Sequence, residues 1–148
     1  MGHAGEHEAF EVPTGETVPW TAPVPDNFTK PWWAACRARR LLVRRCGGCG
    51  RLHFPPRPAC PYCWSEEVDW YETSGAGTIY TFSIVRENDM APFSRSLPYV
   101  PAIVALNEGP RLMTTIIESP WRAIAVGAAV IVSFVDREDW TFPAFRVR

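Results

Sequence analysis

The stretch CGGCGRLHFPPRPACPYC, residues 46–63, decides the fold of this chain. It holds two Cys-x-x-Cys pairs, Cys46/Cys49 and Cys60/Cys63, with ten residues between them. A tight Cys-x-x-Cys turn brings two thiolates to a metal from one side, so two turns complete a tetrahedral shell with each sulfur about 2.3 Å from zinc. Pro61 stiffens the second turn, and glycines allow left-handed backbone in the first, namely Gly47, Gly48 and Gly50. The spacing predicts a structural zinc ribbon.

Other uses of the four cysteines stay open at this point. Two disulfides would need an oxidising compartment, but the first residues, MGHAGEHEAFE, are acidic and lack the apolar core of a secretory leader. Four thiolates also suit iron, as in rubredoxin-like electron carriers. His53 lies between the pairs and could replace a cysteine, although we expect a free imidazole beside the ribbon. Hydrolysis at the metal is not expected, because a four-cysteine shell leaves no open position.

Length and composition indicate a globular chain. With 148 residues, 47% of them hydrophobic, it can form one ordinary domain plus a small metal module. The longest nearly apolar run, residues 123–135, is shorter than the roughly 20 residues that a membrane helix requires. We therefore expect a cytoplasmic protein with no membrane span.

Charge is distributed unevenly along the chain. Residues 1–35 carry a net −4 and residues 59–148 a net −4, whereas residues 36–58 carry seven arginines and no acid. This basic segment surrounds the first cysteine pair, and it could hold phosphates, meet an acidic partner, or be a solvated face. Guanidinium groups pair bidentately with phosphates and carboxylates, so the candidate contacts are Arg44, Arg45 and Arg57.

The N-terminal third combines a lead-in with a helix. Residues 1–28 are rich in proline and acids, which predicts an extended or disordered segment. A short helix is expected from about Pro31 to Arg39. Neighbouring residues on a helix point about 100° apart, so Trp32 and Trp33 cannot both face one small core. They are candidate interface anchors, or they straddle the groove between the helix and the next strand. Cys36 is expected to be a buried small hydrophobe.

The rest of the chain reads as strands. Segments 41–45 and 52–54 form the ribbon hairpin, and segment 68–72 leads out of the ribbon. Five further strands follow from Thr78, with a hairpin at residues 107–110 and a short insertion at residues 118–126. The expected fold is mainly β, with an N-terminal helix, a rubredoxin-like zinc ribbon and a five-stranded OB-fold barrel; an SH3-like barrel is the competitor. The expected divisions are 1–28 for the lead-in, 29–72 for the helix and ribbon, and 73–148 for the barrel.

The order of these modules resembles a known family, the zinc-ribbon OB-fold proteins associated with acyl-CoA metabolism, formerly a domain of unknown function. The resemblance rests on Trp33 and RRLLVRRCGGCGRLHFPPRPACPYC, then on SGAGTIYT at 74–81, PYVPAIVAL at 98–106, EGPRL at 108–112 and VGAAV at 126–130. It covers roughly residues 28–135. The long acidic, proline-rich start departs from shorter members of the family.

Membership implies a non-catalytic subunit that docks on a thiolase-fold enzyme, or sometimes a hydratase, and that helps handle acyl-CoA. Such partners make or break carbon–carbon bonds, as thiolases, acyltransferases and steroid side-chain aldolases do. A hetero-oligomer with acyl-CoA as a shared ligand is therefore expected. The residues agree, because no Ser-His-Asp set and no phosphate-cradling glycine loop is found, although Glu or Asp could still act as a general base.

Two alternative functions remain at this stage. A single-stranded nucleic-acid binder of the OB type would need a basic groove interleaved with exposed aromatic residues, but residues 59–148, which include the barrel, carry a net −4. No nucleic-acid partner is therefore expected. A rubredoxin-like electron carrier would hold iron in the ribbon and would be coloured.

Overall fold

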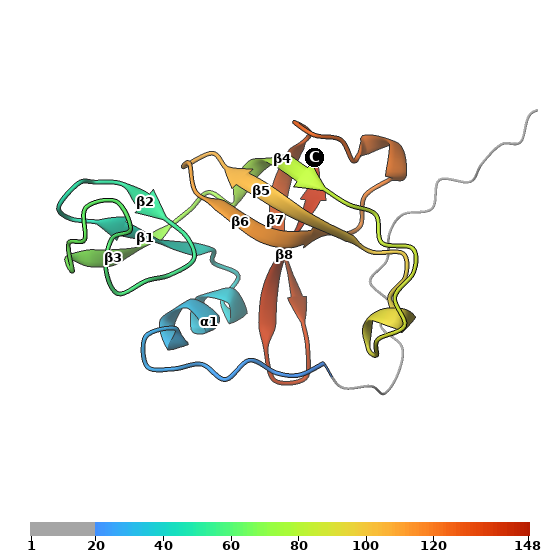
Figure 1. Ribbon diagram of the computed structural model, residues 1–148, viewed down its shortest axis with the longest axis horizontal. Coiled ribbons are helices and arrows are strands. Elements are labelled where there is room, and N and C mark those ends of the chain that lie inside the picture. Colours follow the sequence, from blue (N-terminus) through green and yellow to red (C-terminus); the bar gives the residue numbers. More distant parts are fainter. Residues whose placement is uncertain (1–19) are drawn as a thin grey trace, which may run out of the picture.

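The computed structural model describes residues 20–148, and the expected lead-in therefore lies mostly outside the described residues. One helix is followed by a small sheet and then by a barrel (Figure 1). The ordered elements are α1 (Lys30–Arg37), β1 (Leu42–Cys46), β2 (Leu52–His53), β3 (Val68–Glu72), β4 (Ala76–Phe82), η1 (Phe93–Arg95), β5 (Val100–Leu106), β6 (Arg111–Ile116), η2 (Trp121–Ala123), β7 (Ala129–Asp136) and β8 (Thr141–Val147).

The zinc ribbon is a three-stranded antiparallel sheet in the order β2-β1-β3. Its central strand, β1, pairs with β2 through Arg44 opposite His53, and with β3 through Arg44 opposite Trp70. Both Cys-x-x-Cys turns lie at the same end of this sheet, because β1 ends in the first pair and the second pair precedes β3, whose first residue, Val68, lies opposite Cys46.

The C-terminal part is a closed five-stranded barrel in the order β4-β5-β6-β8-β7, which confirms the predicted OB-type barrel. β6 and β8 close it through a parallel pairing, while the other pairs are antiparallel. Alternate residues of β5 are buried, as expected for a strand with one face toward a core. The β5–β6 hairpin turns at Gly109, whose φ of +111° is a conformation that favours glycine.

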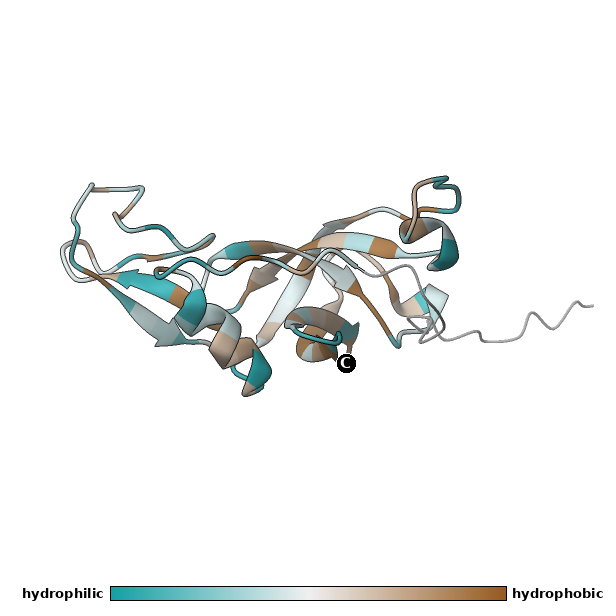
Figure 2. Ribbon diagram, turned by 90° about the horizontal axis from the view of Figure 1, so that it is seen from below, coloured by the Kyte–Doolittle hydropathy of each residue, from teal (hydrophilic) through white to brown (hydrophobic). Residues whose placement is uncertain are grey.

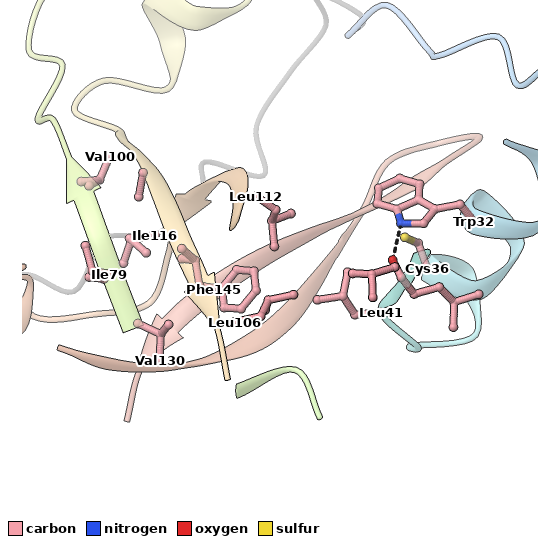
Figure 3. Close-up of a cluster of buried hydrophobic side chains, with 14 of the residues drawn as sticks. Trp32, Cys36, Leu41, Ile79, Val100, Leu106, Leu112, Ile116, Val130 and Phe145 are labelled. Carbon is pink, nitrogen blue, oxygen red and sulfur yellow. Dashed lines mark hydrogen bonds between the residues drawn. The ribbon is translucent and has the colours of Figure 1, made fainter. Parts of the chain in front are cut away.

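One hydrophobic core runs through helix, ribbon and barrel. Trp32 and Cys36 of α1 and the adjoining Leu41 belong to the same buried cluster as Leu106 and Phe145 of the barrel (Figure 3). The indole N–H of Trp32 donates a hydrogen bond to the backbone carbonyl of Leu42 at 3.0 Å. Cys36 is fully buried, as predicted, and burial raises the pKa of its thiol to about 12.

Polar contacts fasten the end of α1 to the β7–β8 hairpin. Arg37 donates to the carbonyl of Asp139 at 2.8 Å, and Arg39 forms an ion pair with Asp136. Arg40 pairs with Glu72 of β3 at 2.7 Å. Figure 1 shows α1 between the ribbon sheet and the β7–β8 hairpin, and Figure 2 shows hydrophobic colour on several of the barrel strands. The helix therefore fixes the ribbon relative to the barrel.

Several expectations about local structure need correction. The strand expected from Thr78 begins at Ala76 and ends at Phe82, with a bulge between Ile79 and Thr81 in its pairing with β5, and Val85 then makes an isolated bridge with Tyr99. Of the three glycines in the first cysteine turn, Gly50 alone has a positive φ. The insertion expected at residues 118–126 contains one 3-10 turn, η2.

Candidate functional site

The four cysteines of the ribbon meet at one point. Their Sγ atoms all lie within 4.8 Å of one another, with Cys46 and Cys63 3.5 Å apart and Cys49 and Cys60 3.7 Å apart. A tetrahedral zinc with sulfurs about 2.3 Å away requires sulfur–sulfur separations of about 3.8 Å. The donor set and its spacing therefore fit a structural zinc ion, and the two Cys-x-x-Cys turns form a zinc ribbon.

Backbone groups prepare the sulfurs for metal binding. The N–H of Cys49 donates to Cys46 Sγ at 3.4 Å, and the N–H of Tyr62 donates to Cys60 Sγ at the same distance. The bond from Cys49 lowers the pKa of the Cys46 thiol to about 6, because a hydrogen bond to a thiolate favours the charged form. Each turn thus supplies one buried sulfur that already has an amide donor.

His53 is not a member of this metal cluster. It is buried on the neighbouring strand, opposite Arg44. Burial, together with the positive charges of Arg44 and Arg57, lowers the pKa of His53. The imidazole is therefore neutral at physiological pH, and the metal shell consists of four thiolates with no open position for a substrate.

The candidate phosphate-binding arginines do not form one cluster. Arg44 is buried, lies over the rings of Phe28 and Trp70 at 5.0 and 4.5 Å, and donates to the carbonyl of Val68. Its guanidinium is therefore used to hold the chain's own structure. Arg45 points to the opposite face of β1, where it is exposed over Tyr71. Arg57 is exposed on the side of His53. Two of the three candidates remain accessible, on different faces.

The two candidate interface tryptophans also differ in their surroundings. Trp32 is only 8% exposed and belongs to the core described above. Trp33 is half-buried, with its ring 4.8 Å from Trp32 and 6.0 Å from Trp140, both in edge-on geometry. The pair therefore joins the helix to the ribbon and to the β7–β8 hairpin, and only part of Trp33 is left at the surface.

An exposed aromatic tip on the ribbon was missed by sequence reasoning. Trp64, directly after the last zinc ligand, is 80% exposed and has a φ of +63°, and Tyr62 is 54% exposed. Arg51 lies over the Tyr62 ring at 4.9 Å. We call Arg51, Tyr62 and Trp64 the ribbon tip. The sequence feature that could have predicted this surface is an aromatic residue in or next to a Cys-x-x-Cys turn. Such a turn has no hydrophobic core in which the ring could be buried.

The sequence matches two domain families that meet within the chain. Residues 33–69 match the family described as ChsH2, rubredoxin-like zinc ribbon domain. Residues 70–135 match the family described as ChsH2, C-terminal OB-fold domain. The fold and the four-cysteine site thus define a zinc-ribbon OB-fold protein.

Similar proteins identify the family. A DUF35 domain-containing scaffold protein of Methanocaldococcus jannaschii is 35% identical over 113 residues, which is 74% of this chain and 78% of that protein. A solved structure, "Ltp2-ChsH2(DUF35) aldolase", matches with a TM-score of 0.75 and 32% identity, over 85% of this chain and 98% of that one. The chain belongs to the DUF35 family.

Some relatives are subunits of named enzymes. A probable enoyl-CoA hydratase alpha subunit of Thermomonospora curvata is 34% identical over 116 residues, 78% of this chain and 36% of that protein. The benzoylsuccinyl-CoA thiolase subunit BbsA of Thauera aromatica is 33% identical over 96 residues, 65% of this chain and 63% of that protein. The chain thus spans little more than a third of the hydratase subunit. Within residues 20–148, no helix is long and apolar enough to cross a membrane.

Proposed function

We propose that this chain is a non-catalytic accessory subunit that docks on a thiolase-fold enzyme and helps bind or channel acyl-CoA during carbon–carbon bond formation or cleavage. The observation that carries the proposal is the ribbon tip, an exposed aromatic and cationic surface on a rigid, metal-closed turn. Exposed Trp, Tyr and Arg are the residue types that dominate protein–protein interfaces. The relatives named as thiolase and hydratase subunits, and the aldolase structure, support the same role.

The metal centre favours a structural role for the zinc over a catalytic one. Four thiolates close the zinc shell, so the ion can neither activate water nor polarise a carbonyl while they remain bound. Its effect is to hold β1, β2 and both cysteine turns rigid without a large core. We propose that the zinc is structural and that it presents Trp64 and Tyr62 to the partner enzyme in a fixed orientation.

The accessible arginines suit the coenzyme part of an acyl-CoA. Arg45 and Arg57 are exposed, and guanidinium groups bind phosphate oxygens through paired N–H donors. Because they lie on different faces of the ribbon, one of them can meet the coenzyme phosphates while the other meets acidic groups of the partner. The barrel segment, residues 73–148, carries seven acids and seven arginines, so it lacks the net positive charge that single-stranded nucleic-acid binding requires.

Affinity capture from the native host's lysate tests this proposal. The tagged, zinc-loaded chain should retain a protein that mass spectrometry identifies as a thiolase-fold enzyme. Trp64→Ala should lower its recovery by about tenfold or more, as expected for an interface hot spot worth about 2 kcal/mol. Val126→Ala, at an exposed barrel position, is the matched control and should retain the enzyme fully. Recovery of a monodisperse monomer without such an enzyme would contradict the proposal.

A further inference from the structure

A second feature of the chain lies away from the ribbon tip. A cavity of about 440 Å³ opens between the barrel, the η1 segment and the helix. Small-molecule pockets in proteins fall between about 300 and 1,000 Å³ and are lined mainly by apolar and aromatic groups. The cavity described here has that size, and most of its walls are apolar, including Trp20, Phe54, Phe93 and Trp140.

The aromatic walls are held by contacts with one another. Trp20 meets Phe93 edge-on with ring centres 5.0 Å apart, and the rings of Trp140 and Phe142 lie 5.2 Å apart. Aromatic pairs at these separations stabilise one another beyond their burial. The walls are therefore flat, wide surfaces that are already in place, which suits a ligand built of flat rings.

Two threonine hydroxyl groups in the cavity lining are already engaged. Thr114 donates to the carbonyl of Pro143, and Thr115 donates to the carbonyl of Val100, both at 3.0 Å. The hydroxyl protons of these two threonines are therefore not free for a ligand.

Arg137 is the exception in this apolar lining. Its guanidinium lies over the Trp20 ring at 4.8 Å and over the Phe142 ring at 5.7 Å. Its Nε is buried and has no hydrogen-bond acceptor among residues 20–148. The ion pairs found in this part of the chain use Arg39 and Arg40 instead. Because a guanidinium stays protonated, its buried N–H leaves one cationic donor without an acceptor.

We propose that this cavity binds a small ring-bearing carboxylic acid, with the rings between the aromatic walls and the carboxylate on the Arg137 guanidinium. A carboxylate supplies the acceptor that Nε lacks and the negative charge that balances the cation. The neighbouring rings exclude water from the pair, which strengthens it. The site belongs to the chain itself, so it is tested without a partner enzyme, and its failure would leave the docking proposal standing.

Calorimetry with two matched probes tests the site on the full, zinc-loaded chain. 2-Naphthoate should bind about tenfold or more tightly than the neutral 2-naphthylmethanol, since a charge-assisted bond is added to the same ring contacts. Arg137→Met should reduce the affinity for naphthoate to that for the alcohol, while the affinity for the alcohol stays within about twofold. Arg146→Met, at an exposed position on β8, removes the same charge elsewhere and should change neither affinity.

Indole N–H signals locate the probe. Naphthoate should shift the NMR signals of Trp20 and Trp140 and leave that of Trp64 at the ribbon tip unchanged. Equal affinities for acid and alcohol, an unchanged preference in Arg137→Met, or no saturable binding would overturn the proposal. Changing the four glutamates of residues 1–19 to glutamine should leave naphthoate affinity unchanged; a large gain would assign Arg137 to the chain's own acids and would also overturn it.

Discussion

Cys46 Sγ and Cys63 Sγ lie 3.5 Å apart, although 17 positions separate these residues in the chain. This contact joins the turn after β1 to the turn before β3, and the zinc ion that the four sulfurs fit would lock it. The metal site is therefore a structural clamp for the ribbon tip.

Removing one zinc ligand should free the two cysteine turns from each other. Cys46→Ser is expected to abolish stoichiometric zinc binding and to cost several kcal/mol of folding free energy in the ribbon, because structural zinc binding and folding are linked. Zinc content by mass spectrometry and thermal unfolding measure both effects. Cys36→Ala is the control, since Cys36 lies in the core and outside the metal cluster; this variant should keep one zinc per chain. A ribbon that stays folded without zinc would contradict the assignment.

Substitutions of the buried Trp32 and the exposed Trp64 should have different effects on stability. Trp32→Ala removes a buried ring and its bond to Leu42, so it should lower the free energy of unfolding by about 3–5 kcal/mol. Trp64→Ala changes an exposed side chain, and its effect on stability should stay within about 0.5 kcal/mol. Urea titrations measure both variants. A large loss of stability in Trp64→Ala would mean that the ribbon tip serves the fold and not a partner.

A glycine in β4 should be intolerant of even one added carbon. A Cβ at Gly77 would lie 2.4 Å from the carbonyl oxygen of Ala105 on the paired strand β5. Gly77→Ala should therefore destabilise the barrel by about 1–3 kcal/mol, as overpacking does. At Gly47 the same Cβ would make ordinary contacts of 3.4 Å with Glu67, so Gly47→Ala should be nearly neutral. Equal midpoints of denaturation for the two variants would contradict this difference.

The lowered pKa of His53 should make stability depend on pH. The unfolded chain takes up a proton on this histidine near pH 6.5, whereas burial, Arg44 and Arg57 oppose protonation in the folded chain. The free energy of unfolding should therefore fall as the pH drops below about 6.5 and continue to fall until the folded-state pKa is reached. His53→Gln should reduce this slope. Comparing the two proteins at equal zinc content removes the contribution of the cysteines, and identical slopes would show that His53 does not contribute.

Substitution of the exposed arginines should raise the KM of the complex for acyl-CoA. If Arg45 or Arg57 binds coenzyme phosphates, its change to Gln should raise the KM for the acyl-CoA by about tenfold or more, since a hydrogen bond to a charged group contributes about 1.5–3 kcal/mol. Steady-state kinetics of the captured complex give this value. Arg122→Gln, at an exposed barrel position, is the control. An unchanged KM in both ribbon variants would remove the phosphate role.

The ribbon and the barrel could be predicted because their signals are local. Cys-x-x-Cys spacing follows from metal geometry, and the alternation in β5 follows from having one face on a core. The bulge inside β4 could not be predicted, because a bulge depends on pairing with another strand, which a single strand's pattern does not show.

The cavity could not be predicted because its walls come from distant parts of the chain. Trp20, Phe93 and Arg137 meet only after the barrel has closed and the helix has packed on the β7–β8 hairpin. The structural use of Arg44 was hidden for the same reason, since the rings of Phe28 and Trp70 that it contacts come from other segments. Sequence identified the charge but not its neighbours.

The central claim is that this chain supports catalysis by another protein and performs none itself. Turnover of acyl-CoA should be measured with the purified chain, with the captured thiolase-fold enzyme, and with the two recombined at equal zinc content. We expect no turnover by the chain alone and a higher rate for the recombined complex than for the enzyme alone. Turnover by the chain alone, or an enzyme whose rate and KM do not change when the chain is added, would contradict the proposed role.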